Sequence, residues 1–535
     1  MTKKSFFKGA VILGIAGLIV KVFGAFFRIP LANIIGDTGM GYYQTAYPIY
    51  VLLLTLSTSG IPTAIARLVS ERTAVGNHRE AYRVFRLSFQ LLLGLGIVTC
   101  LILFTGAPYI VQIMKGETEA IYSMRAIAPA LLFVPMMAAF RGYFQGLQDM
   151  TPTASSQVIE QLFRVVCGLS LALLLLPYGL KFAAAGASSG AAIGAVCGLI
   201  AIFILFLKRR RGIVESCSNS VSDEKEPAKK ILSRIIIIAV PVTIGAAIMP
   251  IMSNIDLLIV VRRLVDTGYT SAEANSLYGQ LSGFATPLIN LPQVLTQSIA
   301  MSLVPAIAAA HRSKDTEFLQ YNATFGIRTA MLVGMPCAVG LMVLAQPIML
   351  LLYPAQQESA LSAAESLVIL AFGSIFLSLV QTLTGILQGI GKQLVPVFNL
   401  AVGAAVKIVV TYVLTGIPSV NVKGAAAGTA AAYLTATILN LMAVRRYTGC
   451  RAAFSMTYGK PVISAAVMGI VVWGIYHLVS LAAGNVISTL LSVLCGVIVY
   501  AALILKLKGI TAEEIERLPK GSKIVEILRL KGGKH

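Results

Sequence analysis

Residues 8–27 read KGAVILGIAGLIVKVFGAFF, an apolar run with one lysine, Lys21, in its interior. A helix needs about 20 apolar residues to cross the hydrocarbon core of a bilayer, and this run has that length. The rest of the chain has the same character, since 57% of its 535 residues are hydrophobic and only 12% are charged. The run therefore predicts the first span of an all-α, polytopic membrane protein.

Fourteen runs of this kind follow one another along the chain. They lie near 8–27, 44–66, 85–106, 121–140, 157–177, 183–207, 232–260, 279–308, 325–352, 364–390, 395–415, 424–444, 461–482 and 487–505. Lys and Arg concentrate in the connecting segments on one side, among them the N-terminus, KRRR at 208–211 and the C-terminal residues. Because cytoplasmic segments carry this excess, we expect a multi-pass protein of the bacterial cytoplasmic (inner) membrane with both termini in the cytoplasm.

The two halves of the chain contain similar sequences. FRGYFQGL at 140–147 corresponds to LTGILQGI at 383–390, and AAAG at 183–186 recurs at 425–428, at offsets of 243 and 242 residues. Such a period predicts two six-helix pseudo-repeat lobes in parallel orientation. The expected parts are an N-lobe at 1–207, a cytoplasmic linker at 208–231, a C-lobe at 232–446, two further helices within 447–508 and a cytoplasmic tail at 509–535.

Seven charged residues fall in the interior of the apolar runs and not at their ends. They are Lys21, Arg125, Glu160, Arg164, Asp256, Arg328 and Lys407. A charge at the centre of a bilayer costs about 2.5–3.5 kcal/mol, so we expect all seven to face a protein interior or a water-filled cavity. Cations outnumber anions among them, and guanidinium groups match the geometry of phosphate oxygens. This composition favours an anionic cargo.

Polar residues mark one face of the run at 157–177. Gln157, Glu160, Gln161 and Arg164 are spaced i, i+3, i+4 and i+7, which places them on one side of a helix. Glu160 precedes Arg164 by four residues, the favoured order for a helical ion pair, and such a pair is expected to orient Arg164. The alternative interpretation of this face is a structural ion pair that joins helices.

Other candidate cavity residues lie in the first span and in the second half. They are Lys21 and Arg28 near the external end of the first span, and Asn290, Gln293, Asn399 and Lys407 in the predicted C-lobe. For Arg28 the alternative is that its side chain reaches to the membrane interface. Asp256 and Glu160 are candidates for coupling transport to an ion, and Asp256 could instead pair with Arg328.

Several classes of protein lack support in the sequence. There is no HExxH, GxGxxG or Walker A motif, and the seven cysteines include no CxxC pair. We therefore expect no enzymatic activity, no cofactor, no metal site and no ATP-driven pump. The net charge of +21 is that of a membrane protein with basic cytoplasmic segments, and nucleic acid is not expected as a partner.

Some stretches also resemble a known family. VKVFGAFFRIPLANIIGDTGMGYY at 20–43, FRGYFQGLQDMTPTASSQVIEQLFRV at 140–165 and YGQLSGFATPLINLP at 278–292 are similar to the stage V sporulation protein B branch of the polysaccharide and lipid II flippases, within the multidrug/oligosaccharidyl-lipid/polysaccharide exporter superfamily. The resemblance implies fourteen helices around a central cavity, an undecaprenyl-diphosphate-linked sugar as cargo, and Lys21 and Arg28 near the diphosphate. The second span lacks a central arginine, and YGQL stands at 278–281 where lipid II flippases carry Asp-Arg.

The resulting hypothesis is a flippase. It would carry an undecaprenyl-diphosphate-linked cell-wall or polysaccharide precursor from the cytoplasmic to the external leaflet by alternating access. Its expected partners are this lipid-linked oligosaccharide, membrane lipids and, further, cell-wall synthesis enzymes. The alternatives are an ion-coupled drug extruder of the same superfamily and a non-transporting membrane scaffold for wall synthesis.

Overall fold

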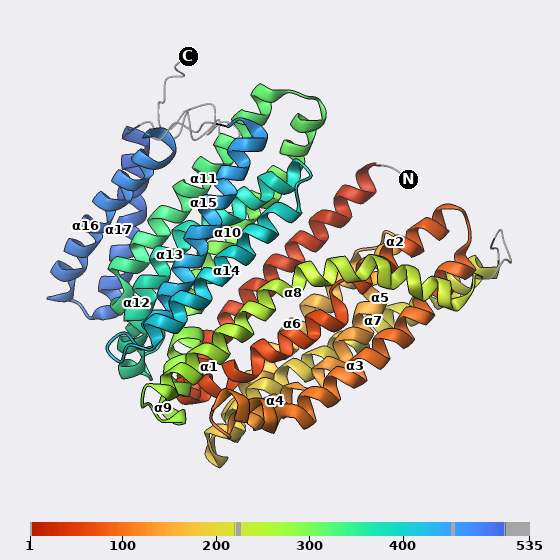
Figure 1. Cartoon of the computed structure of the whole chain (residues 1–535), viewed down its shortest axis with the longest axis horizontal. Helices are drawn as coiled ribbons and strands as arrows, with labels where there is room; N and C mark the ends of the chain where they lie inside the picture. The colour runs from red at the N-terminus through yellow and green to blue at the C-terminus, as the bar shows by residue number, and fades with distance from the viewer. Residues whose placement is uncertain (1–2, 219, 221–225, 451–454, 508, 510–535) are drawn as a thin grey trace. The chain divides into compact units, whose positions relative to one another are not determined.

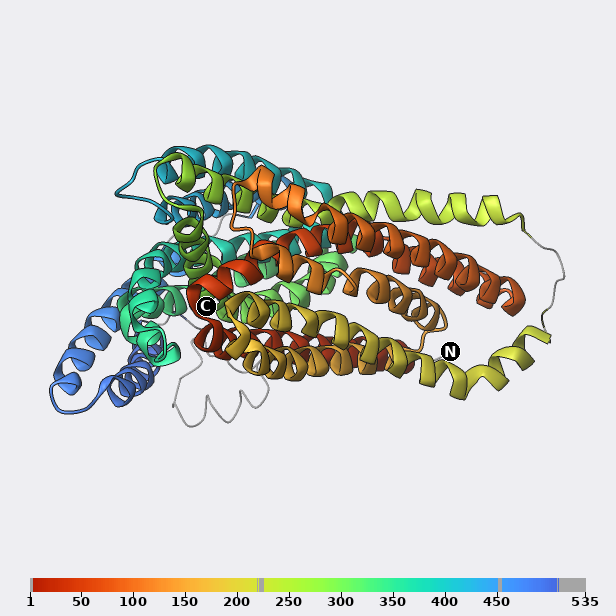
Figure 2. The same cartoon turned by 90° about the horizontal axis from the view of Figure 1, so that it is seen from below.

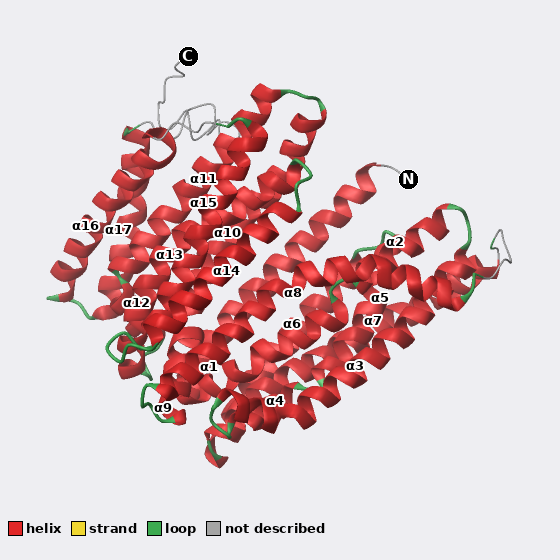
Figure 3. Cartoon of the chain, in the orientation of Figure 1, coloured by secondary structure: helices red, strands yellow, loops and turns green. Residues whose placement is uncertain are grey.

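The described part of the chain is built from helices, with no strand among them (Figure 3). The computed structural model describes residues 3–218, 220, 226–450, 455–507 and 509, and only the backbone of residues 3–11, 15, 21, 25 and 291. Helices are expected because backbone N–H and C=O groups in hydrocarbon must bond within their own segment. The α-helices are α1 (Lys3–Thr58), α2 (Ile61–Ala74), α3 (His78–Met114), α4 (Ala120–Ile127), α5 (Ala130–Gly146), α6 (Thr151–Leu175), α7 (Leu180–Ser218), α8 (Ala228–Asp266), α9 (Ser271–Gly279), α10 (Thr286–Arg312), α11 (Thr316–Val343), α12 (Ala345–Leu352), α13 (Gln357–Gly389), α14 (Leu394–Thr415), α15 (Lys423–Thr448), α16 (Lys460–Ser480) and α17 (Asn485–Lys506).

Thirteen helical stretches in the described residues are long and apolar enough to cross a membrane. The first stretch, Ile12–Ala74, contains the first two predicted spans, because α1 bends sharply at Gly36, where φ is 64° and ψ is −171°. A backbone with positive φ favours glycine, which has no Cβ to clash. The predicted all-α, polytopic membrane fold is confirmed.

The predicted linker at 208–231 is largely helical. α7 continues to Ser218 and carries the KRRR segment with it, and α8 begins at Ala228 directly after Pro227. Figure 2 shows the end of α7 and the start of α8 at the same end of the N-terminal part. The predicted tail at 509–535 lies outside the described residues except for Gly509.

The chain forms two compact units. The first unit comprises residues 1–287, 353–359 and 408–425, and the second comprises 288–352, 360–407 and 426–535. Helices α8 and α9, placed by the sequence in the C-lobe, pack in the first unit, where α8 contacts α1, α2 and α3 (Figure 1). The six-helix lobes and the internal repeat stay predictions.

Small residues set the closest helix packing of the first unit. Gly186, Gly190, Gly194 and Gly198 recur every fourth residue on the face of α7 that meets α6. A Cβ on Gly194 would lie 2.5 Å from the backbone oxygen of Glu160. Such spacing lets membrane helices approach closely, and it fixes the turn of α6 that carries the predicted polar face.

Each unit has its own apolar core. In the first unit, Phe85 of α3 packs against Phe140 of α5 with ring centres 5.0 Å apart and against Phe206 of α7 at 5.6 Å. In the second unit, fully buried side chains such as Leu383 and Ile386 of α13 pack with those of α11. These cores hold the helices that carry the polar residues.

Candidate functional site

The bend in α1 brings two parts of the same helix together around Tyr47. Arg28 precedes the bend and Tyr47 follows it, yet the guanidinium carbon of Arg28 lies 5.7 Å from the centre of the Tyr47 ring. A guanidinium over an aromatic face is attracted by the ring quadrupole, so Tyr47 holds Arg28 within the unit.

Arg164 of α6 reaches the same tyrosine. Its guanidinium carbon lies 5.2 Å from the centre of the Tyr47 ring. Among the described residues, none of the ion pairs involves Arg28 or Arg164. We call Arg28, Tyr47 and Arg164 the arginine cluster. It presents two cations over the same tyrosine ring.

A row of tyrosines on α1 forms the support of the arginine cluster. The Tyr43 and Tyr47 rings are stacked with centres 5.7 Å apart, and Tyr50 follows at 6.0 Å from Tyr47. Tyr43 and Tyr50 are buried, at 2% and 3% exposure. The sequence analysis did not single out these tyrosines, although their i, i+4 and i+7 spacing in GYYQTAYPIY predicts one helical face.

The predicted helical pair of Glu160 and Arg164 is replaced by a different pair. Glu160 accepts a hydrogen bond from Arg141 of α5 at 2.9 Å, and Arg141 also donates to the hydroxyl of Ser156 at 2.9 Å. Arg141 directly follows the apolar run at 121–140, so the sequence alone does not distinguish it from the basic residues of the connecting segments. Arg164 turns instead to the tyrosines, which face it from α1.

The other candidates of the first unit lie on α6, α8 and α1. A Cβ added at Gly24 of α1 would lie 3.6 Å from the side-chain nitrogen of Gln161, so these two residues are neighbours. Gln157 is half-buried on the same face of α6. Asp256 is half-buried on α8 and interacts electrostatically with Tyr278. The side chain of Lys21 lies outside the described residues.

The candidates of the second half lie in the second unit. Asn399 is buried and its amide donates to the side-chain oxygen of Asn440 at 2.8 Å, a contact between α14 and α15. Asn290 and Gln293 are half-buried on α10, and Lys407 is half-buried on α14. These residues are spread over two helices of this unit.

Arg125 is the exposed one among the intramembrane charges whose side chains the structure describes. Its side chain is exposed on α4, where it donates to the carbonyl of Phe104 at 3.4 Å and lies 5.6 Å from the centre of that ring. Arg125 stands five residues after the first residue of α4. A long side chain so near a helix end can extend to the membrane interface. Arg328, by contrast, is buried in α11 at 8% exposure.

Comparison with known proteins places this chain in a family. A family model described as polysaccharide biosynthesis protein matches residues 6–311, more than half of the chain. The chain belongs to the polysaccharide biosynthesis protein family. A second model, MatE, matches residues 282–413. The recognition made from the sequence motifs is thereby confirmed.

The relatives of this chain match it over most of its length. Stage V sporulation protein B of Bacillus subtilis is 28% identical over 527 residues, which cover 97% of this chain and 98% of the relative. Lipid II flippase MurJ of Bacillus subtilis is 27% identical over 480 residues, 87% of each chain. The solved structure of lipid II flippase MurJ in an inward closed conformation matches with a TM-score of 0.69 at 15% identity, over 92% of this chain and 98% of that one. An inward-facing multidrug resistance MATE family transporter matches with a TM-score of 0.67 at 14% identity, over 82% and 98%.

A second cluster of hydrogen-bonded polar residues in this chain lies at the bend of α1. The carboxylate of Asp37 accepts hydrogen bonds from the hydroxyl of Ser276 at 2.6 Å, the amide of Gln280 at 2.9 Å and the hydroxyl of Ser359 at 2.8 Å, and from the backbone of Thr38 at 2.6 Å. It thus joins α1 to α9 and to the segment 353–359. Sequence reasoning missed this centre because its partners lie more than 200 residues away.

Proposed function

We propose that this chain is a flippase that moves an undecaprenyl-diphosphate-linked cell-wall or polysaccharide precursor from the cytoplasmic to the external leaflet by alternating access, with both termini in the cytoplasm. The carrying observation is the arginine cluster, in which two half-buried guanidiniums meet on Tyr47 inside a multi-pass membrane protein. Moving a diphosphate and sugar through hydrocarbon costs several kcal/mol for each unsatisfied polar group. Fixed cations inside a protein lower that cost.

The known proteins support this proposal. The family is one of polysaccharide biosynthesis, and one relative over 87% of the chain bears the name lipid II flippase. Solved structures of this fold are described as inward-facing and outward-facing conformations of one transporter family. A fold that occurs in both states suits alternating access.

Each candidate residue has a role in the proposal. Arg28 and Arg164 bind the diphosphate oxygens, and Lys21, two helical turns before Arg28 on α1, adds positive charge. The amides of Gln157 and Gln161 serve the sugar hydroxyls, and the polar residues of the second unit stay candidates within their own unit. Asp256 is the candidate for ion coupling, since Glu160 is occupied by Arg141. One unit charge crossing 100 mV supplies about 2.3 kcal/mol.

The drug-extruder alternative is favoured by the MatE match at residues 282–413 and by the structural likeness to a multidrug resistance MATE family transporter. Extruded drugs that carry a positive charge would be repelled by two guanidiniums with no carboxylate paired to them among the described residues. An anionic cargo is attracted by the same pair. The arginine cluster therefore favours the lipid diphosphate.

Translocation in vesicles that contain only this protein tests the proposal. A labelled lipid-linked precursor is placed in one leaflet, and its arrival in the other is followed with an impermeant quencher. We expect translocation by the unaltered chain, its loss in Arg164→Ala, and its retention in Arg125→Ala, which removes an exposed arginine from the same unit. No translocation by well-folded protein would reject the flippase and leave the scaffold alternative.

A further inference from the structure

The ring of Tyr47 is held by aromatic neighbours along α1. Tyr43 stacks on it with ring centres 5.7 Å apart and an interplanar angle of 16°, and the ring of Tyr50 lies 6.0 Å from it. Tyr43 in turn packs against the buried ring of Phe27 at 6.1 Å. Stacked and tilted aromatic pairs at these separations are favourable. Tyr47 is therefore the middle ring of an ordered row.

The backbone that carries Tyr47 is tied to neighbouring helices. The amide of Asn254 on α8 donates to the backbone oxygen of Pro48 at 2.8 Å. The hydroxyl of Thr45 bonds the side-chain oxygen of Asn275 on α9 at 3.3 Å, and both of these side chains are buried. An arginine side chain, by contrast, is long and has many rotamers. Tyr47 is thus a fixed support for flexible arginine side chains.

Two guanidiniums from different segments meet at this ring. Arg28 lies in the part of α1 before the bend and Arg164 lies on α6, and their guanidinium carbons are 5.7 and 5.2 Å from the centre of the Tyr47 ring. Because both distances end at the same ring, the two cations lie near each other although like charges repel. The attraction of the ring for each cation opposes that repulsion.

An aromatic ring holds a guanidinium without neutralising it. Arg141 of the same unit pairs with the carboxylate of Glu160, and this pairing cancels its charge. The Tyr47 side chain is uncharged near neutral pH, so Arg28 and Arg164 keep their positive charges on its ring. Both charges thus remain to attract an anionic ligand.

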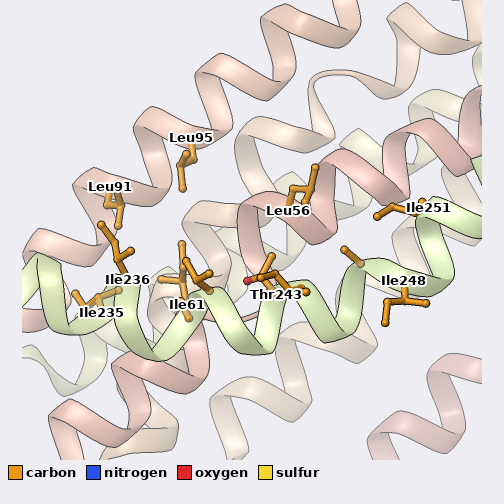
Figure 4. A pocket seen from close by; sticks show the side chains of 13 residues that line it. Leu56, Ile61, Leu91, Leu95, Ile235, Ile236, Thr243, Ile248 and Ile251 are labelled. Atoms are coloured by element: carbon orange, nitrogen blue, oxygen red, sulfur yellow. The ribbon is translucent and has the colours of Figure 1, made fainter. Parts of the chain in front are cut away.

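The aliphatic groove along α8 lacks such charges (Figure 4). It has a volume of about 460 Å³, and side chains such as Ile236 and Ile248 line it. Thr243 is the one polar side chain among its described lining residues, and its hydroxyl accepts a hydrogen bond from the backbone N–H of Gly60 at 3.1 Å. An anion placed there would lose its hydration without gaining a cation. The arginine cluster, and not this groove, suits a phosphate.

We propose that Tyr47 is the positioning residue of the diphosphate site, where its ring holds Arg28 and Arg164 together so that each binds one phosphoryl group. The inference rests on the proposed function and adds the residue that selects a diphosphate over a single phosphate. One guanidinium can bind two oxygens of one phosphoryl group, so a second guanidinium nearby favours a ligand with two such groups. A support that orders both cations beforehand reduces the entropy lost on binding.

Titration of the purified full chain with inorganic diphosphate and with orthophosphate tests this role. The measured quantity is the ratio of the two affinities at one pH and one ionic strength. Tyr47→Leu removes the ring, and Tyr47→Phe retains it without the hydroxyl. Tyr122→Leu on α4 is the matched control, because the ammonium of Lys181 lies 5.3 Å from the centre of the Tyr122 ring, outside the arginine cluster.

We expect Tyr47→Leu to lower the preference for diphosphate about tenfold, because the two guanidiniums no longer share a support. Tyr47→Phe and Tyr122→Leu should keep the preference of the unaltered chain. General loosening of the fold would weaken the binding of both ions and leave their ratio unchanged. The ratio therefore separates positioning from a merely structural role.

Three results would contradict the proposal. An unchanged ratio in Tyr47→Leu would overturn the role of Tyr47 alone, and a loss of preference in Tyr47→Phe would assign the effect to the hydroxyl instead of the ring. An unaltered chain without a preference for diphosphate would overturn the selectivity of the site. Translocation in vesicles tests the proposed function separately, so its failure is distinguishable from all three.

A second measurement preserves the shape of the ring and does not depend on the folding of Tyr47→Leu. Phenylalanines with increasing numbers of ring fluorines are incorporated at position 47, since fluorine withdraws electron density from the ring face and weakens its attraction for cations. The preference for diphosphate should fall stepwise along this series, and the same series at position 122 should leave it unchanged. A constant preference along the series at position 47 would refute the support by the ring.

Discussion

Arg141 donates to Glu160 at 2.9 Å across the contact between α5 and α6, and both side chains are largely buried, at 14% and 21% exposure. Arg141 thus neutralises the negative charge of Glu160, which lies one helical turn before Arg164. The Arg164 guanidinium lies over the Tyr47 ring, and none of the ion pairs among the described residues joins it to a carboxylate. The pair thus leaves the arginine cluster available for an anion.

Removal of one partner of this pair should destabilise the protein. Arg141→Ala leaves the Glu160 carboxylate largely buried without its cation, which costs about 2–3 kcal/mol. Replacement of both residues, in Arg141→Met/Glu160→Met, should recover most of that loss because no buried charge remains. Thermal unfolding in detergent measures both variants. A double variant no more stable than Arg141→Ala would contradict this account of the pair.

Replacement of Arg164 by lysine should distinguish the contribution of its positive charge to diphosphate binding from that of its guanidinium geometry. Lysine keeps the positive charge but lacks the fork that binds two phosphate oxygens. We expect diphosphate binding to weaken about tenfold in Arg164→Lys and further in Arg164→Ala, measured by titration with inorganic diphosphate. Arg125→Lys is the matched control and should bind as the unaltered chain does. Equal binding in Arg164→Ala and the unaltered chain would remove Arg164 from the site.

The sequence predicted helices and charges better than it predicted their partners. Long apolar runs can only be helices in hydrocarbon, and Arg164 is a candidate because a charge is costly there. Arg28 is a candidate from its place at the external end of the first span and from the family resemblance. Which helix faces meet is a property of the fold, so the convergence of both arginines on Tyr47 was not predictable from spacing. Arg141 was missed for the same reason, since its partner Glu160 lies on another helix.

The hydrogen bonds of Asp37 should hold the segment 353–359. Ser359 is bonded directly to the carboxylate, and the backbone N–H of Ala355 donates to the side-chain oxygen of Asn33 at 3.3 Å. Asp37→Ala removes the acceptor of several hydrogen bonds at once, each worth about 1 kcal/mol or more. Hydrogen–deuterium exchange of peptides covering 353–359 should therefore speed up at least about tenfold.

The control for Asp37 is another carboxylate of the same unit. Asp266 is more exposed and pairs with Lys115 at 2.7 Å, and none of its described hydrogen bonds or ion pairs involves the segment 353–359. Asp266→Ala should leave the exchange of this segment unchanged, because exposed ion pairs contribute little. The same acceleration in both variants would show general loosening of the unit and would refute a specific role of Asp37.

The close approach of α6 and α7 should make Gly194 sensitive to a single added methyl group. In Gly194→Ala the new Cβ would lie 2.5 Å from the backbone oxygen of Glu160 and 3.0 Å from the Cβ of Arg164, so the helices must separate. Overpacking of this kind costs about 1–3 kcal/mol. Because the displaced turn carries Arg164, diphosphate binding should weaken together with the loss of thermal stability. Gly94→Ala on α3 is the control, since its Cβ meets nothing within 4 Å, and it should be neutral or slightly stabilising. Unchanged stability and binding in Gly194→Ala would show that the α6–α7 contact does not position the arginine cluster.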